Sequence, residues 1–152
     1  MPELRLEIDT LRLDEEWQAQ PKQRQIWGEL LADAQFELDE AKSALDMVRA
    51  ETDREIREDP EAFGVGKVTE SAISTAVIVH PAVKVSTKKL HAARHTVNVL
   101  QAAVDGLEHR KRALSMLVEL HGQSYYSDTP TRMPAGVKNK QRREDKDDND
   151  DG

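Results

Sequence analysis

The chain has 152 residues, of which 38% are hydrophobic, 34% charged and 4% aromatic, and it contains no cysteine. One domain is expected at this length, and the scarcity of aromatic residues disfavours a sandwich, a barrel or a doubly wound sheet around a compact core. The missing cysteines exclude disulfides and thiolate metal sites. No apolar run approaches the roughly 20 residues of a membrane helix, and no signal peptide opens the chain, so we expect a cytoplasmic protein without membrane contact.

The net charge of −7 is unevenly distributed. Residues 1–61 carry a net charge of −10, residues 62–122 one of +4 and residues 123–152 one of −1. Such asymmetry indicates separate binding surfaces. An acidic helix paired with a basic helix within one molecule gives the same pattern, so both interpretations stay open.

Residues 1–13 are expected to form an N-terminal arm, either a short strand or an extended segment, because three apolar residues alternate there. Asp14 is the predicted N-cap of the first helix, and the two glutamates after it lie where a helix dipole favours acids. Pro21 is expected to break or restart this helix, because proline removes a donor and clashes with the preceding turn.

Beyond Pro21 the apolar residues follow an unbroken spacing of four and three. They are Trp27, Leu31, Ala34, Leu38, Ala41, Leu45 and Val48. Sustained spacing of this kind is typical of a left-handed coiled-coil seam. It predicts a helix over roughly residues 22–58, about 55 Å long, with the seam fading at Thr52 and Ile56.

The chain is expected to turn at residues 59–68, the Pro/Gly-rich stretch between the two halves. Thr69 then caps a short apolar helix that ends before His80, and Pro81 opens a second long helix, where its missing donor costs nothing. This helix carries a second seam: Leu90, Ala93, Val97, Leu100, Val104, Leu107, Lys111, Leu114, Val118 and His121.

Gly122 is the predicted left-handed residue that ends this second helix. Residues 123–152 lack periodicity and are predicted to be a disordered, charged tail. Five of its six bases lie before Glu144, and six of its seven acids lie from Glu144 onward. An acidic terminus either keeps the protein soluble or mimics a nucleic acid.

Two long helices joined by a short turn-rich segment predict an all-α fold, a coiled-coil-like antiparallel hairpin over residues 14–122 with a short connecting helix. One helix pair buries little surface, and several apolar residues lie off the seams. These are Ile26, Leu30, Phe36, Met116, Leu117 and Leu120. We therefore expect the protein to oligomerise.

No motif in the sequence supports catalysis, a metal or a cofactor. The stretch Gly64–Thr69 departs from a phosphate loop, because Val68 separates the lysine from the threonine and no buried strand precedes it. His91 and His95 share a helix face, but no carboxylate lies within a turn of them. The paired carboxylates of the first long helix are those of a solvated face.

Basic residues on the two long helices are the candidate nucleic-acid contacts, because stripes of positive charge can follow a phosphate backbone. The second helix carries Lys84, Lys88, Lys89, His91, Arg94 and His95, then a further cluster at residues 109–112; the first carries Arg49, Arg54 and Arg57 near its end. Ion pairing of these bases with the acidic helix is the simpler interpretation and is slightly favoured by the residues alone.

Five stretches carry a resemblance to a known family. They are Leu13-Asp-Glu-Glu-Trp17, Glu37-Leu-Asp-Glu-Ala-Lys-Ser-Ala-Leu-Asp46, Val68-Thr-Glu-Ser-Ala-Ile-Ser-Thr-Ala76, Gln101-Ala-Ala-Val-Asp-Gly-Leu-Glu-His-Arg-Lys-Arg-Ala-Leu114 and Leu120-His-Gly-Gln123. Over roughly residues 10–127 the chain resembles phage recombination mediator proteins of the UvsY type.

The resemblance implies a non-enzymatic protein of the host cytoplasm that binds single-stranded DNA, forms a ring-like homo-oligomer and acts in DNA recombination and repair. Such a protein helps to load a RecA-like recombinase onto strands covered by single-strand-binding protein. In that family a Lys-x-Arg-Leu-Asp run contacts DNA, which here corresponds to Lys42–Asp46 with Ala44 at the arginine position. Arg49, Arg54 and Arg57 are the candidates to replace that arginine.

A different class of function also fits the pattern. The leading alternative is a coiled-coil adaptor or assembly protein whose charges pair its own helices and which binds no nucleic acid. A metal-dependent enzyme is the third possibility.

Overall fold

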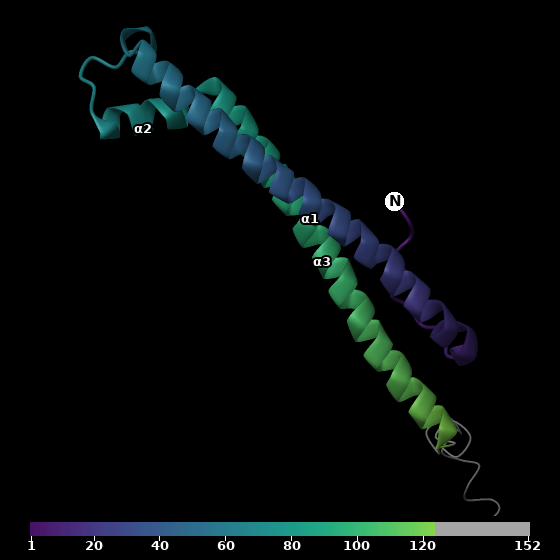
Figure 1. The fold of residues 1–152 in the computed structure, drawn as a ribbon. Coiled ribbons are helices and arrows are strands. Elements are labelled where there is room, and N and C mark those ends of the chain that lie inside the picture. The colour runs from purple at the N-terminus through teal and green to yellow at the C-terminus, as the bar shows by residue number, and fades with distance from the viewer. Residues whose placement is uncertain (124–152) are drawn as a thin grey trace, which may run out of the picture.

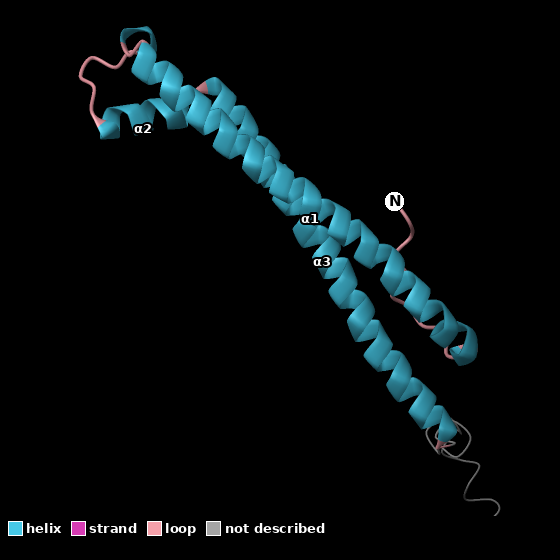
Figure 2. Cartoon of the chain, viewed as in Figure 1, coloured by secondary structure: helices cyan, strands magenta, loops and turns pink. Residues whose placement is uncertain are grey.

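The computed structural model describes residues 1–123, and these form a helical hairpin without a strand (Figures 1 and 2). Helix α1 spans Leu13–Glu58, a 3₁₀ turn η1 spans Glu61–Phe63, α2 spans Glu70–Val79 and α3 spans Pro81–Gly122. The predicted all-α hairpin with a short connecting helix is therefore confirmed. The predicted tail lies, from residue 124 onward, outside the described residues.

The long helices α1 and α3 run antiparallel along their shared length (Figure 1). Side-chain contacts fix their register. Gln20 of α1 is hydrogen-bonded to Arg110 of α3, and Arg24 Nε lies 2.8 Å from Glu108 Oε1. Further along, Leu45 shares a buried cluster with Val83. In each of these pairs the two residue numbers add to about 130. A residue of α1 and a residue of α3 whose numbers add to about 130 therefore lie at the same height, which here means the same position along the hairpin axis.

Two apolar clusters hold the hairpin together. At its tip, the end with α2, the cluster consists of Leu45, Ile56, Val65, Ile73, Val77 and Val83. Toward the open end, where α1 begins and α3 ends, it consists of Trp27, Ala34, Leu100, Ala103, Val104 and Leu107. The tip thus has a third helix over its core, whereas the other cluster is covered by Leu4 of the arm.

Helix α1 continues through Pro21, contrary to the prediction of a break. Proline adopts a helical φ, although it lacks a donor and crowds the preceding turn, and the 4-3 spacing of the seam runs on across it through Trp17, Gln20 and Arg24. Gln20 is only 5% exposed and donates from Nε2 to the carbonyl of Leu107 at 2.8 Å. These contacts with α3 hold both sides of Pro21 in one helix.

The predicted N-cap at Asp14 is wrong, because α1 begins at Leu13 and Asp14 lies in its first turn. The residue before the helix, Arg12, makes no side-chain cap. Glu16 instead accepts the backbone N–H of Asp9 at 3.0 Å. An acid of the first turn therefore ties the arm to the helix.

The second predicted seam holds as far as Leu107 and then shifts. Lys111, Val118 and His121 are exposed, whereas Arg110 is buried. The step from Leu107 to Arg110 is three residues where the predicted seam takes four, because Arg110 turns inward to Gln20, Glu16 and the arm, and Leu114 remains buried as predicted. The members of the seam from this point are Leu107, Arg110, Leu114 and Leu117.

The predicted end at Gly122 also needs correction, because Gly122 is the last residue of α3 and Gln123 follows as its C-cap, with φ −82°. Within residues 1–123 the glycine with positive φ is Gly64 (φ 73°), which ends η1. At the tip, two predictions are confirmed. Thr69 caps α2 through the N–H of Ala72, and Pro81 is the first residue of α3.

No helix in the described part of the chain combines the length and apolar character required to cross a membrane.

Candidate nucleic-acid interface

The first half of α3 carries six basic side chains, defined here as the α3 stripe: Lys84, Lys88, Lys89, His91, Arg94 and His95. All six are exposed. The steps from Lys84 to Lys88 and from His91 to His95 are single helical turns, so these side chains follow one another along the helix. The stripe is about 16 Å long, at about 1.5 Å per residue.

The α3 stripe has no acidic neighbours in sequence and makes no ion pair within residues 1–123. No Asp or Glu occurs between Glu70 and Asp105. The ion pairs that join different helices lie elsewhere, at Arg24–Glu108, Arg57–Glu70 and Arg110–Glu16. The expected pairing of these bases with the acidic helix is therefore not seen in the described chain, and the stripe keeps its positive charge.

The candidate cations of α1 differ, because each is paired with an acid of its own helix. The pairs are Lys42–Asp39 at 2.8 Å, Arg49–Asp46 at 4.0 Å, Arg54–Glu58 at 3.7 Å and Arg57–Asp53 at 2.7 Å. Surface pairs of this kind stabilise little and exchange readily. They nevertheless cancel the local charge, so α1 offers a weaker field to a phosphate than α3 does.

Arg57 is the most firmly held of these cations. It donates two hydrogen bonds to Glu70 of α2, at 3.0 and 2.8 Å, besides its contact with Asp53. These bonds raise the pKa of Arg57 above its usual value and lower the pKa of Glu70. Arg57 therefore ties α2 to α1, which makes it a poor candidate for DNA contact.

The antiparallel register brings the two sets of candidates into the same half of the molecule. Lys42 of α1 stands at the height of Lys88 of α3, and Arg49 at the height of Pro81, by the pairing described above. Arg54 and Arg57 lie nearer the tip. Lys42 therefore lies level with the α3 stripe along the hairpin axis.

The second basic cluster, residues 109–112, is split by the fold. Arg110 points inward, only 5% exposed, whereas His109, Lys111 and Arg112 are exposed. The Arg110 guanidinium donates to Gln20 Oε1 at 2.5 Å, to the carbonyl of Glu7 at 3.1 Å and to the Glu16 carboxylate. This group therefore serves the fold and not a ligand.

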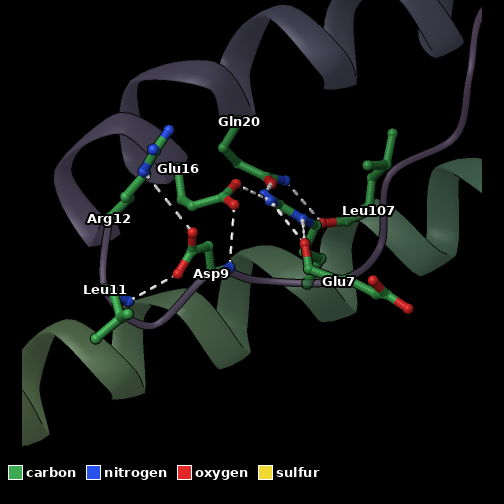
Figure 3. A network of polar contacts seen from close by, with 8 residues as sticks. Glu7, Asp9, Leu11, Arg12, Glu16, Gln20 and Leu107 are labelled. Carbon is green, nitrogen blue, oxygen red and sulfur yellow. Dashed lines mark hydrogen bonds and ion pairs between the residues drawn. The ribbon is translucent and has the colours of Figure 1, made fainter.

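Figure 3 shows how this polar cluster joins three segments: Glu7 and Asp9 from the arm, Glu16 and Gln20 from α1, and Leu107 from α3. Hydrogen bonds from the Asp9 N–H and from Arg110 lower the pKa of Glu16, although its burial acts in the opposite direction. The cluster was missed in the sequence because Arg110 is flanked by other bases. The available signal was that Arg110 follows Leu107, a seam residue, by three positions, which is a spacing typical of the buried face.

The open end also carries apolar surface that the sequence did not single out. Trp17, 46% exposed, separates two shallow hollows. One is lined by Gln20, Pro21, Arg24, Gln25, Glu108 and Lys111 together with Trp17, and the other by Thr10, Leu11, Leu13, Asp14, Val118 and His121. Mixed apolar and charged walls of this kind fit a protein partner better than a phosphate backbone.

The shifted ionisable groups are ion-pair members. Glu16, Glu70 and Glu108 have lowered pKa values, and for Glu108 the main cause is the hydrogen bond from Arg24. Each shift stabilises the charged form, whereas a carboxylic acid acting near neutral pH needs a raised pKa. His91 and His95 are exposed, and residues 1–123 hold no group of three metal-ligating side chains.

Comparisons of the chain with protein-family models, with curated proteins and with solved structures found no match.

Proposed function

We propose that this protein binds single-stranded DNA through the α3 stripe and acts as a recombination mediator. The observation that carries the proposal is the set of exposed cations at Lys84, Lys88, Lys89 and Arg94, which have no acidic partner in the described chain. Unpaired cations in a row are the feature that a phosphate backbone recognises.

The dimensions of the stripe favour weak binding by each copy. Four cations over about 16 Å contact only a few phosphates. A strand held by several copies of an oligomer gains avidity, because each further contact is intramolecular once the first has formed. Such binding is tight overall and yet locally reversible.

Local reversibility suits the role that the resemblance implies. A strand whose contacts open one copy at a time can be passed from single-strand-binding protein to a RecA-like recombinase without full release. The exposed apolar hollows around Trp17 are available for one of these proteins. Handover between proteins thus requires no catalytic group on this chain.

The test is an anisotropy titration of a labelled single-stranded oligonucleotide at several salt concentrations. The log of the binding constant should fall by about 0.7 per log unit of salt for each phosphate neutralised. The double variant Lys84→Ala/Arg94→Ala should bind at least tenfold more weakly and show a smaller salt slope. Equal weakening of wild type and variant by salt would contradict the assignment.

A matched control removes two cations elsewhere, with Lys22→Ala/Lys67→Ala. These side chains are exposed and make no ion pair within the described residues. The control changes the net charge by the same amount as the stripe variant. It should therefore bind nearly as tightly as the wild type, so that any difference reports position and not total charge.

One observation favours the alternative of a protein-only adaptor. Trp17, Leu11 and Val118 are exposed around the open-end hollows, as is usual for a surface that receives a protein. An adaptor of this kind should show no oligonucleotide binding even at low salt, where the mediator should bind most tightly.

A further inference from the structure

Helix α1 has an apolar and acidic face that points away from α3. Phe36 and Met47, each 64% exposed, border a shallow hollow whose other walls are Asp39, Glu40, Ser43 and Ala44. Ser43 and Ala44 are small, so the floor of the hollow is open between the two large side chains. A hollow formed by residues one and two turns apart is the kind that receives a side chain of a neighbouring helix.

Helix α3 has a complementary apolar row beside its basic stripe. Val85, Ala92 and Val99 are seven residues apart and exposed, the two valines at 54% and 47%. Ala92 and Val99 each lie one residue before a seam position, and so about 100° around the helix from it. The next position of the row is Gly106, where Leu6 of the arm lies so close that an added Cβ would approach it to 3.3 Å. The arm therefore already seats an apolar side chain on this row.

The two faces lie at the same height along the hairpin. By the register of α1 and α3, Met47 and Ala44 are level with Val85, and Phe36 is level with the residues just after Ala92. A second copy placed beside the first, without displacement along the long axis, thus brings one face against the other.

The charges around the two faces are of opposite sign. Asp33, Glu37 and Glu40 surround the α1 face and make no ion pair within residues 1–123, while Lys88 and Lys89 lie on either side of the apolar row of α3. Glu40 is level with Lys89 in the register. Side-by-side copies therefore place free acids next to free bases.

We propose that the α1 face of one copy binds the apolar row of α3 on the next copy. The contact is heterologous, because the two surfaces differ, and it leaves each copy with one free face of each kind. Copies joined without axial displacement close into a ring, whereas displaced copies form a filament. The inference rests on the proposed function for the requirement that copies assemble, and it names the surfaces that assemble them.

Lys84, His91 and Arg94 stay outside this contact, since they lie farther around α3 from the row at Val85, Ala92 and Val99. The same helix thus offers one side to a neighbouring copy and another to a strand. A ring built this way aligns the α3 stripes of successive copies at one level, which is the arrangement that multivalent binding of one strand requires.

The absence of cysteine allows a direct test with two single-cysteine variants, Ala44→Cys and Val85→Cys. These positions are level in the register, and a short bismaleimide should join them between copies. An equal mixture of the two variants should give a crosslinked dimer, and neither variant alone should do so. The double variant Ala44→Cys/Val85→Cys should give a ladder of higher species.

Gln101→Cys is the matched control, because it is exposed on α3 at a height far from Ala44. Mixed with Ala44→Cys, it should give no dimer. As a second measurement, Glu40→Lys should lower the mass found by light scattering, and the double reversal Glu40→Lys/Lys89→Glu should restore it. Failure of the reversal to restore assembly would overturn the pairing of these faces.

The outcomes separate this inference from the proposed function. Crosslinking of Ala44→Cys with itself, or an oligomer that gives no crosslink in the mixture, would overturn the interface while leaving DNA binding intact. The expected crosslinks in a protein that ignores oligonucleotides would support the interface and overturn the mediator. A monomer by light scattering would overturn both.

Discussion

The two ends of the hairpin are closed by different chemistry. At the tip, α2 lies over α1 and α3, and the buried cluster there is apolar throughout, with Ile56 fully buried at its centre. At the open end no third helix is present within residues 1–123. The arm takes its place, and a buried cluster of Arg110, Glu16 and Gln20 ties it down.

The difference shows how a two-helix protein can fix its register. Apolar seams of regular spacing tolerate a shift by one heptad, because each position then meets another apolar residue. A buried guanidinium tolerates no such shift, because its desolvation is compensated only where Gln20, Glu16 and the carbonyl of Glu7 meet it. The tip therefore supplies much of the stability, and the open end sets the alignment.

Removal of Arg110 should have the largest effect. Arg110→Ala leaves the buried Gln20 and the half-buried Glu16 without their partner, and we expect a loss of about 3–5 kcal/mol. Hydrogen exchange should rise mainly in the arm and the first turns of α1, with the tip still protected. Lys111→Ala, an adjacent exposed base, is the control and should change little. Equal loss of protection at both ends would contradict the division proposed here.

Truncation at the tip should have a similar or smaller effect. Ile56→Ala opens a cavity in the apolar cluster and should cost about 2–5 kcal/mol in urea denaturation. Ile78→Ala in α2 removes the same atoms from a side chain that is 63% exposed, and it should cost less than about 0.5 kcal/mol. A comparable loss in both variants would show that burial of Ile56 does not hold the tip.

Elements that depend on local rules could be predicted from the sequence. The turn at residues 59–68, the cap at Thr69 and the start of α3 at Pro81 follow from residues a few positions apart. The end of α1 at Glu58 was predicted correctly for the same reason. The seams from Trp27 to Val48 and from Leu90 to Leu107 were found because their period is long and regular.

The open end could not be predicted, because its order depends on contacts more than 80 residues apart in the chain. Pro21 stays within α1 only because Gln20 and Arg24 contact α3 on either side of it. In the sequence Arg110 cannot be told from its neighbours in the basic cluster at residues 109–112, because its burial depends on the arm and on α1. Local propensity gives way to tertiary contact at each of these positions.

The sequence identified the basic residues of the candidate site but not which of them are free of ion pairs within residues 1–123. The α3 stripe was predicted as a run of bases, and the structure places all of them in solvent without an ion pair within residues 1–123. The sequence could not tell these bases from those of α1. The pairing of Lys42, Arg49 and Arg57 with acids three or four residues away depends on side-chain geometry. Their role in binding stays a prediction.

Pro21 offers a way to strengthen the open end. Pro21→Ala restores a donor to the interior of α1 and relieves the clash of the ring with the preceding turn, worth about 3 kcal/mol in a helix. About 1 kcal/mol is lost because alanine leaves the unfolded chain more freedom. We expect a net gain of about 2 kcal/mol in chemical denaturation. A lower stability would mean that the contacts of the proline ring in the Trp17 hollow contribute more free energy to folding than the proline costs the helix backbone.

Acid should loosen the open end before the tip, and this is the smallest effect expected. The pKa of Glu16 is lowered in the folded protein by the Asp9 N–H and by Arg110, relative to about 4.3 in the unfolded chain. The stability that Glu16 contributes is therefore complete above about pH 4.3 and is lost as the pH falls through the lowered folded value. Glu16→Gln lacks this charge, so the difference in stability between it and the wild type should shrink between pH 5 and pH 2. A constant difference over that range would mean that the charge of Glu16 does not hold the arm.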